Sequence, residues 1–273
     1  MQDGELLSRM KQFSKLIRKY VLDMMNNAQS SHIGSCYSIV EILTVLYLKI
    51  LNIDPKNPNW EDRDRFVLSK AHASPTLYAV LSELGFFPKN LLMKYYVDGG
   101  ILPNHLDKYS VPGIEFSLGS LGHGLSVGLG MALGNHLNRN PGRVFVLLGD
   151  GECNEGSVWE AAMLAPHLKL KNLTAIIDYN KIQSFGNTNE VINQEPVAQK
   201  WKSFGWEVFE IDGHKFNELI DSLSQPLSKP RMIIAHTVKG KGVSFMENSL
   251  DWHYKSTNKE QYEKALKELN DSN

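Results

Sequence analysis

The sequence has few cysteines, almost no net charge and no long uninterrupted hydrophobic run, and each of these absences excludes a class of protein. Its two cysteines, Cys36 and Cys153, form neither a disulfide framework nor a paired zinc-ligand spacing. The formal net charge is −1, which excludes a broad electrostatic attraction to nucleic acid or anionic membranes. The most apolar run, "IVEILTVLYLKIL", is short and interrupted by Glu41 and Lys49, unlike a membrane span. The N-terminal stretch is too charged for a signal peptide. We therefore expect a cytoplasmic protein with reduced thiols and neither a nucleic acid nor a membrane partner.

The first half of the chain shows helical periodicity. Apolar residues recur at steps of three and four over about 5–28, which predicts an amphipathic helix, and a second helix is expected over about 38–51. "RFVLS" is typical of a short strand, and "SPTLYAVLSELG" of a helix that ends at Gly85. Residues 97–120 form a long connection with glycine and proline, and such loops are commonly functional.

The second half alternates strands with helices. After the glycine-rich helical segment "LGHGLSVGLGMALGNHL", four short apolar runs predict strands: "RVFVLLG", "LTAIIDY", "WEVFEID" and "RMIIAHT". Apolar strands separated by helices favour a parallel sheet covered on both faces. A polar helix is expected at the C-terminus. The sequence thus predicts a doubly wound α/β fold with a mostly parallel sheet, forming one domain over 1–273.

Polar residues follow two of these strands. "GDG" (149–151) ends one strand and "DYNKIQ" (178–183) ends the next, so Asp150 and Asn180 should meet at one edge of the sheet. Each sequence alone is an ordinary tight turn. Together they favour a site, because a carboxylate and an amide oxygen suit Mg²⁺ or Ca²⁺. A bound metal would also explain why an acidic turn, without the lysine of a P-loop, could hold a phosphate.

Five motifs in order resemble the transketolase family, whose members bind thiamine diphosphate. They are "SSHIGS" (30–35), "DPKNPNWEDRDRFVLSKAHASPTLYAVL" (54–81), "PGIEFSLGSLGHG" (112–124), "GDGECNEGSVWEAA" (149–162) and "TVKGKGVSFMENSLDWH" (237–253). The resemblance covers almost the whole chain. It implies the diphosphate-binding domain of the thiamine diphosphate fold.

The resemblance also implies roles for individual residues. Asp150, Asn180 and the main-chain oxygen of Ile182 would bind Mg²⁺ or Ca²⁺. The residues expected to contact the cofactor are His72, Gly119, Leu121, Gly151, Glu155, Asn180 and His253. Glu155 and Glu160 match glutamates that the family uses near the subunit interface, although Glu155 could equally satisfy the dipole of the helix that follows it.

Four histidines fall at positions that correspond to the family's active site. The resemblance places His32 and His253 near the transferred group, His72 near the cofactor and His105 near the donor hydroxyls. Neutral imidazoles can bind sugar hydroxyls and move protons at neutral pH. Tyr254 follows His253 where the family usually has glycine.

The chain resembles only the first domain of a transketolase. The missing part carries the domain that binds the aminopyrimidine ring and most residues that hold a substrate phosphate. The resemblance therefore implies the N-terminal subunit of a split transketolase, inactive without a separate C-terminal subunit, with which it would form a heterotetramer. Pentose phosphates are the family's usual substrates.

Three alternatives remain at this point. One is a subunit of a deoxyxylulose-phosphate synthase-like or 2-oxo acid decarboxylating thiamine enzyme, which shares "GLSVGLGMALG" and "TVKGKGV". Another is a cofactor-binding module without catalysis. A nicotinamide-binding domain fits poorly, because the glycines of "GHGLSVG" follow a loop and lack the dinucleotide-binding spacing.

Overall fold

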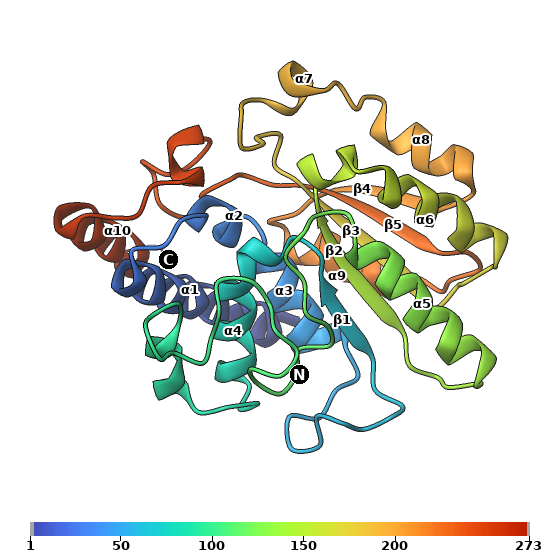
Figure 1. Cartoon of the computed structure of the whole chain (residues 1–273), viewed down its shortest axis with the longest axis horizontal. Helices are drawn as coiled ribbons and strands as arrows, with labels where there is room; N and C mark the ends of the chain where they lie inside the picture. Colours follow the sequence, from blue (N-terminus) through green and yellow to red (C-terminus); the bar gives the residue numbers. More distant parts are fainter. Residues whose placement is uncertain (1–2, 272–273) are drawn as a thin grey trace.

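Five parallel strands form the centre of the fold in the computed structural model, which describes residues 3–271 (Figure 1). Their order across the sheet is β1-β2-β3-β5-β4. The bounds are β1 Arg65–Leu68, β2 Val144–Gly149, β3 Leu173–Tyr179, β4 Glu207–Asp212 and β5 Arg231–His236. All five predicted strands are present and parallel, and β2 pairs with β3, as the site hypothesis required.

The sequence of each strand matches its place in the sheet. Every residue of β2 and β3 is buried, which agrees with their uninterrupted apolar runs, because strands covered on both faces need no polar alternation. β4 is an edge strand, and its residues are half-buried or exposed. The two central strands therefore form a rigid base whose carboxyl ends carry the site.

Helices cover both faces of the sheet. α5 (Gly124–Leu137), α6 (Gly156–His167) and α8 (Val197–Phe204) lie on one face (Figure 1). β5 lies back between β3 and β4, so the order in which strands are added across the sheet reverses after β4, and a right-handed crossover places α9 (Phe216–Ser224) on the other face. There α9 packs near α3 (Val40–Val45), which contacts α1 (Asp3–Ala28) and α4 (Ser74–Glu83). The doubly wound prediction is confirmed.

The second helix differs from the prediction of one helix over 38–51. Helical structure begins earlier, with α2 (Ile33–Tyr37), continues in α3 and ends in a π-helical turn, η1 (Leu46–Ile50). The window Ile33–Ile50 is the one stretch within residues 3–271 that has the length and composition of a membrane-crossing helix, but 89% of it is buried inside the fold. Packing in the core overrides the weak helix propensity of Gly34 and its neighbouring serine.

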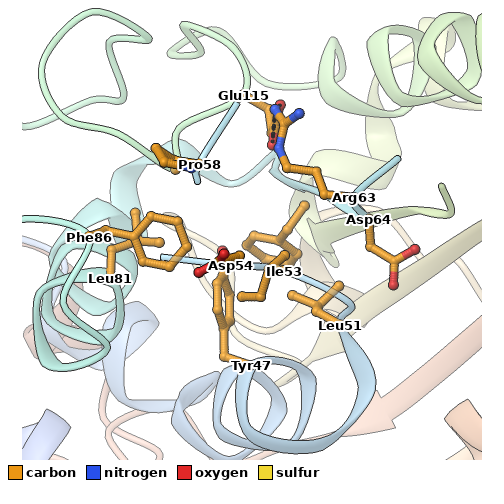
Figure 2. Close-up of a pocket in the computed structure, with 12 residues that line it drawn as sticks. Tyr47, Leu51, Ile53, Asp54, Pro58, Arg63, Asp64, Leu81, Phe86 and Glu115 are labelled. Atoms are coloured by element: carbon orange, nitrogen blue, oxygen red, sulfur yellow. Dashed lines mark hydrogen bonds and ion pairs between the residues drawn. The ribbon is translucent and has the colours of Figure 1, made fainter. Parts of the chain in front are cut away.

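The long connection over 97–120 contains neither helix nor strand, as expected, yet it is fixed in place. A bridge pairs Leu106 with Leu118, and Arg63 donates to both carboxylate oxygens of Glu115 at 2.8 and 3.0 Å. Figure 2 shows this ion pair above a small cavity between α4 and the loop 52–64. At about 10 Å³, that cavity has room for at most one water molecule.

Short elements complete the chain. They are η2 (Ala71–Ala73), η3 (Lys89–Lys94), η4 (Gly151–Asn154), α7 (Thr188–Val191), η5 (Leu250–His253) and the C-terminal α10 (Lys259–Asp271). α10 packs on α1, where the Tyr262 hydroxyl donates to Asp23 at 2.7 Å. The predicted C-terminal helix is present; the last two residues of that prediction, 272–273, lie outside the described range.

Candidate active site

A cavity of about 450 Å³ opens at the carboxyl ends of four neighbouring strands. Lys70 follows β1, Asp150 follows β2, Asn180 follows β3 and Lys239 follows β5. All eleven residues predicted from the sequence as site residues line this one cavity: His32, His72, His105, Gly119, Leu121, Asp150, Gly151, Glu155, Asn180, Ile182 and His253. Residues that lie more than 200 positions apart in the chain thus meet in a single site.

Two of the three predicted metal donors, Asp150 and Asn180, accept hydrogen bonds from backbone N–H groups of the turns that follow β2 and β3. Asp150 Oδ2 accepts a hydrogen bond from the backbone N–H of Lys181 at 2.6 Å, and Oδ1 accepts one from Gly151 at 2.7 Å. Asn180 Oδ1 accepts from the N–H of Ile182 at 3.1 Å. Within residues 3–271 no cluster of three or more His, Cys, Asp or Glu side chains could hold a metal. This site instead combines one carboxylate with amide and carbonyl oxygens, which suit a hard cation.

The environment of these donors fits a cation with an anion beside it. Burial and the neighbouring Asp178 carboxylate raise the pKa of Asp150, which disfavours its ionised form. A cation bound at the carboxylate would offset this effect and favour the ionised form. Gln183 lines the cavity next to Gly151, and its buried Nε2 has no hydrogen-bond partner. A buried amide donor of this kind is suited to a phosphate oxygen. The residues present therefore fit a metal bound to a diphosphate.

Asp178 accepts hydrogen bonds from four side chains next to the cavity. It is fully buried, and its Oδ2 accepts hydrogen bonds from Lys70 Nζ at 2.5 Å, Ser38 Oγ at 2.7 Å and Asn180 Nδ2 at 3.0 Å. Thr237 Oγ1 donates to Oδ1. Burial opposes ionisation, but the Lys70 charge and these donors hold the pKa of Asp178 below its usual value. Because Asp178 engages the amide nitrogen of Asn180, it leaves the amide oxygen for a metal.

Only one of the three acids in the turn belongs to the donor set. Glu152 is buried and accepts hydrogen bonds from Ser69 Oγ, from Gly122 N–H at 2.9 Å and from Gly149 N–H at 3.0 Å. It therefore ties together three backbone segments around the cavity. Glu155 is exposed at the N-cap of α6 and makes no side-chain capping bond. Glu155 is also one of the residues that line the cavity.

Three histidines form a compact cluster in the lining of the same cavity. The ring centroids of His32 and His72, and of His32 and His253, lie 5.1 Å apart, while His72 and His253 are 6.3 Å apart. The backbone holds this arrangement, because the N–H of His32 donates to the carbonyl of His253 at 2.8 Å. Tyr254 closes one side, with its ring centroid 4.6 Å from that of His253.

The cluster consists of neutral imidazoles. Burial, followed by nearby His105 and lysine charges, lowers the pKa of His32 to about 4. Burial and Lys239 lower the pKa of His253 to about 3, and burial with Lys70 lowers that of His72 well below its usual value. At neutral pH these rings can therefore donate and accept hydrogen bonds without carrying charge.

The glycine loop forms the remaining wall. Gly119 lies at van der Waals distance from His105, since a Cβ built on it would be 3.8 Å from that side chain. Leu121 is half-buried in the cavity lining, and the next residue, Gly122, has φ +84. A Cβ at Gly122 would approach Glu155 Cβ to 2.6 Å, so only glycine lets the loop pass this close to α6.

Sequence reasoning missed the two buried lysines. Lys70 and Lys239 are each 1% exposed, and Lys239 Nζ donates to the Ile182 carbonyl and contacts His253 Nδ1, both at 2.8 Å. Burial, followed by Lys70, lowers the pKa of Lys239 to about 8. Both lysines follow predicted strands in "VLSK" and "AHTVK". The rule that singled out Asp150 and Asn180 would have found them too.

Comparison with known proteins agrees with this geometry. The family model for "Transketolase, thiamine diphosphate binding domain" matches residues 9–270. The 6-deoxy-6-sulfo-D-fructose transketolase subunit SqwG of Clostridium sp. (strain MSTE9) is 42% identical over 94% of this chain and 94% of its own length. One subunit of the apulose-4-phosphate transketolase of Phocaeicola vulgatus is 41% identical over 93% of this chain and 91% of its own length.

Single-chain transketolases are longer. The human transketolase is 37% identical over 98% of this chain, which spans 43% of that protein. The solved structure of the Campylobacter jejuni transketolase superposes with a TM-score of 0.89 at 32% identity, covering 96% of this chain and 42% of that one. The chain therefore belongs to the transketolase family as its thiamine diphosphate binding domain, in the form of a subunit of a split transketolase.

Proposed function

We propose that this subunit binds Mg²⁺ and thiamine diphosphate in the 450 Å³ cavity and that, with a separate second chain, it transfers a two-carbon ketol unit from a ketose phosphate to an aldose. The observation that carries the proposal is the joining, in one cavity, of hard metal donors at the ends of β2 and β3 with a wall of neutral histidines. Ca²⁺ would suit the same oxygen donors.

We assign each part of the bound group to residues that line this cavity. Asp150, Asn180 Oδ1 and the Ile182 carbonyl would hold the metal. The Gly151 N–H, Gln183 Nε2 and the Lys239 amine, with the Asn180 side chain, would face the diphosphate, while Gly119, Leu121 and His72 would lie along the cofactor. When bound, the cofactor supplies a thiazolium carbanion that can add to a ketose carbonyl and store the two-carbon fragment.

The histidines would serve the sugar. His32 and His253 lie side by side in the cavity lining, with 5.1 Å between their ring centroids, and would bind the hydroxyls of the transferred fragment and move protons. His105, on the exposed side, would contact donor hydroxyls further along the sugar. Tyr254 narrows the cavity beside His32, with 5.9 Å between the ring centroids. Glu155 would contact the cofactor or the second chain at the rim.

A second chain is needed to complete the site. The chain spans 43% of the human transketolase, and its cavity is bordered by the exposed apolar side chain of Phe185, which lines its mouth. We infer that a chain carrying the pyrimidine-binding and C-terminal domains covers this rim. Exposed Leu137 on α5 and Met163 and Leu164 on α6 offer an apolar face for a second copy of this subunit, with Glu160 beside it. A heterotetramer of two chains of each kind would use both surfaces.

The names of two similar subunits bear on the sugar, and the cysteines of this chain bear on its location. Two similar subunits are named for 6-deoxy-6-sulfo-D-fructose and apulose-4-phosphate, so a ketose outside the pentose phosphates fits as well as a pentose phosphate. Both cysteines are free and buried, which supports a reducing compartment such as the cytoplasm.

The first experiment measures bound cofactor. The chain is purified with any co-purifying partner in Mg²⁺, and its thiamine diphosphate content is compared with that of Asp150→Ala and of Asp221→Ala, an exposed control on α9. We expect full content in the wild type and the control and a severe loss in Asp150→Ala. Equal content in all three would refute the metal site. A complex without cofactor would favour a non-catalytic module.

The second experiment tests the reaction. The complex is assayed with ketose phosphates and, separately, with pyruvate, and the isolated chain is tested alongside. We expect ketol transfer from a ketose phosphate by the complex alone. Turnover of pyruvate would favour the 2-oxo acid alternative, and robust transfer by the isolated chain would contradict the requirement for a second chain.

A further inference from the structure

The loop over 237–243 carries a site residue without being a helix or a strand. Lys239 lies in its middle and extends its amine to the Ile182 carbonyl and to His253 Nδ1. Glycines on either side of Lys241, Gly240 at φ +80 and Gly242 at φ +99, allow the tight path of the backbone. Such a loop does not direct a long, flexible side chain unless other groups fix its backbone.

Three side chains, two of them buried (Arg18 and Glu41) and one half-buried (His214), hold the backbone of this loop. Arg18 on α1 donates to both carboxylate oxygens of Glu41 on α3, at 2.7 and 2.8 Å, and His214 Nδ1 lies 2.9 Å from Glu41 Oε2. We call Arg18, Glu41 and His214 the positioning cluster. Burial opposes ionisation of Glu41, but Arg18 and the hydrogen bond with His214 lower its pKa to about 2. The carboxylate is therefore charged and fully partnered.

The positioning cluster forms hydrogen bonds with the loop backbone on both sides of Lys239. His214 Nε2 accepts the N–H of Val238 at 2.8 Å, so the ring proton sits on Nδ1 and is donated to Glu41. Arg18 Nε donates to the carbonyl of Lys241 at 2.8 Å. Each member that touches the loop thus uses one end for Glu41 and the other for the loop backbone.

The cluster lies outside the active-site cavity. Its three members line a second cavity of about 350 Å³ on the other side of the loop, and none of them lines the cavity that contains Asp150. A buried ion pair often contributes little net stability relative to apolar residues of similar volume. Here Arg18 and His214, the partners of Glu41, also bind the backbone on both sides of Lys239, which points to a role in geometry.

We propose that Arg18, Glu41 and His214 position the Lys239 amine at the metal–diphosphate side of the cavity by holding Val238 and Lys241. The inference rests on the proposed function in one respect, namely that Lys239 faces the diphosphate. None of the three touches the cofactor site, so each acts through Lys239.

A double-mutant cycle tests the coupling. Dissociation constants for thiamine diphosphate in excess Mg²⁺ are measured by calorimetry on the full chain in its complex, for Lys239→Met, His214→Phe and the double variant. We expect each single change to weaken binding about tenfold to a hundredfold, as expected for a charge-assisted hydrogen bond. The double variant should bind no more weakly than Lys239→Met, because His214 acts only through that amine.

Rescue separates positioning from general damage. His214→Gln keeps a donor and an acceptor, and added imidazole can enter the 350 Å³ cavity beside His214→Ala. Both should recover most of the lost affinity, but not in the Lys239→Met background. Arg18→Lys keeps a charge for Glu41 and removes the Nε donor, so it provides an independent variant if His214→Phe does not fold. His136→Phe, an exposed change on α5, is the control.

The outcomes distinguish the two proposals. If Lys239→Met binds as tightly as the wild type, the role of Lys239 at the diphosphate is wrong and the inference fails with it. If Lys239→Met weakens binding but His214→Phe and Arg18→Lys leave it unchanged, or if their effects add to that of Lys239→Met, the positioning role is overturned while the cofactor site stands.

Discussion

In the acidic turn after β2, two glutamates have different surroundings and therefore different roles. Glu152 and Glu155 are three residues apart and carry the same carboxylate. One is buried with three donors, and the other is exposed without a capping bond. The pair therefore offers a direct comparison between a structural acid and a surface acid.

Glu152→Gln is expected to destabilise the chain by about 1–3 kcal/mol, because the new amide group would face N–H and O–H donors and leave one buried donor unpaired. Glu155→Gln should change the free energy of unfolding by less than about 0.5 kcal/mol. Urea denaturation of both variants without cofactor measures the difference. Equal stabilities would mean that Glu152 does not hold the three segments together.

His32 predicts how stability depends on pH. Its pKa falls from an ordinary 6.5 to about 4 in the folded chain. The unfolded chain thus binds a proton below pH 6.5 that the folded chain excludes, so stability falls between pH 6.5 and about 4 and this contribution changes no further below that. His32→Asn should lose less stability over the same range, by about 3 kcal/mol. Urea denaturation at several pH values measures both proteins, and parallel losses would contradict this assignment.

Whether a site residue could be predicted from the sequence depended on its position relative to the end of a strand. Asp150, Asn180 and Ile182 follow strands with clear apolar patterns, so their meeting could be predicted. Asp178 could not, because within "AIIDY" it has the position of a strand residue, and only the three-dimensional structure shows Lys70 and Ser38 reaching it. Partners so distant in sequence leave no local pattern.

Among the elements, α5 shows how glycine has two uses within one helix. A Cβ on Gly128 would lie 2.3 Å from Val146 Cγ2 on β2, so this glycine permits close helix–sheet packing. Gly130, two residues later, is exposed and has no atom within 4 Å of such a Cβ. The same substitution should therefore have opposite effects at the two positions.

Gly128→Ala is expected to cost about 1–3 kcal/mol through overpacking. Gly130→Ala should stabilise the isolated chain by about 0.5–1 kcal/mol, since alanine has the higher helix propensity. Thermal unfolding of both variants provides the measurement. A destabilised Gly130→Ala chain would contradict the open surroundings of this position.

The segment over 33–50 shows why element boundaries are hard to predict. The expected helix began at about residue 38, yet Gly34 is helical and packed against Lys239, whose Cγ would be 3.0 Å from a Cβ on Gly34. Local propensity was outweighed by a tertiary contact that spans more than 200 residues.

At the scale of the whole molecule, the proposed assembly predicts which surface changes matter. Met163 is exposed on α6, on the face proposed to meet a second copy. Met163→Glu should reduce self-association by tenfold or more, because a charge would be buried without a partner, and leave the fold intact. Ser224→Glu, exposed on α9, is the control of equal charge. Sedimentation velocity measures both, and unchanged association of Met163→Glu would exclude this face.

One contact at the centre of the site has a thermodynamic consequence. The Lys239 ammonium donates to the Ile182 carbonyl, an oxygen that the metal would also use. A divalent cation arriving alone would have to displace that ammonium against charge repulsion. With a diphosphate present, the displaced amine gains a new acceptor, so each ligand favours the other. Metal and cofactor should therefore bind with positive cooperativity, equal in magnitude whichever binds first.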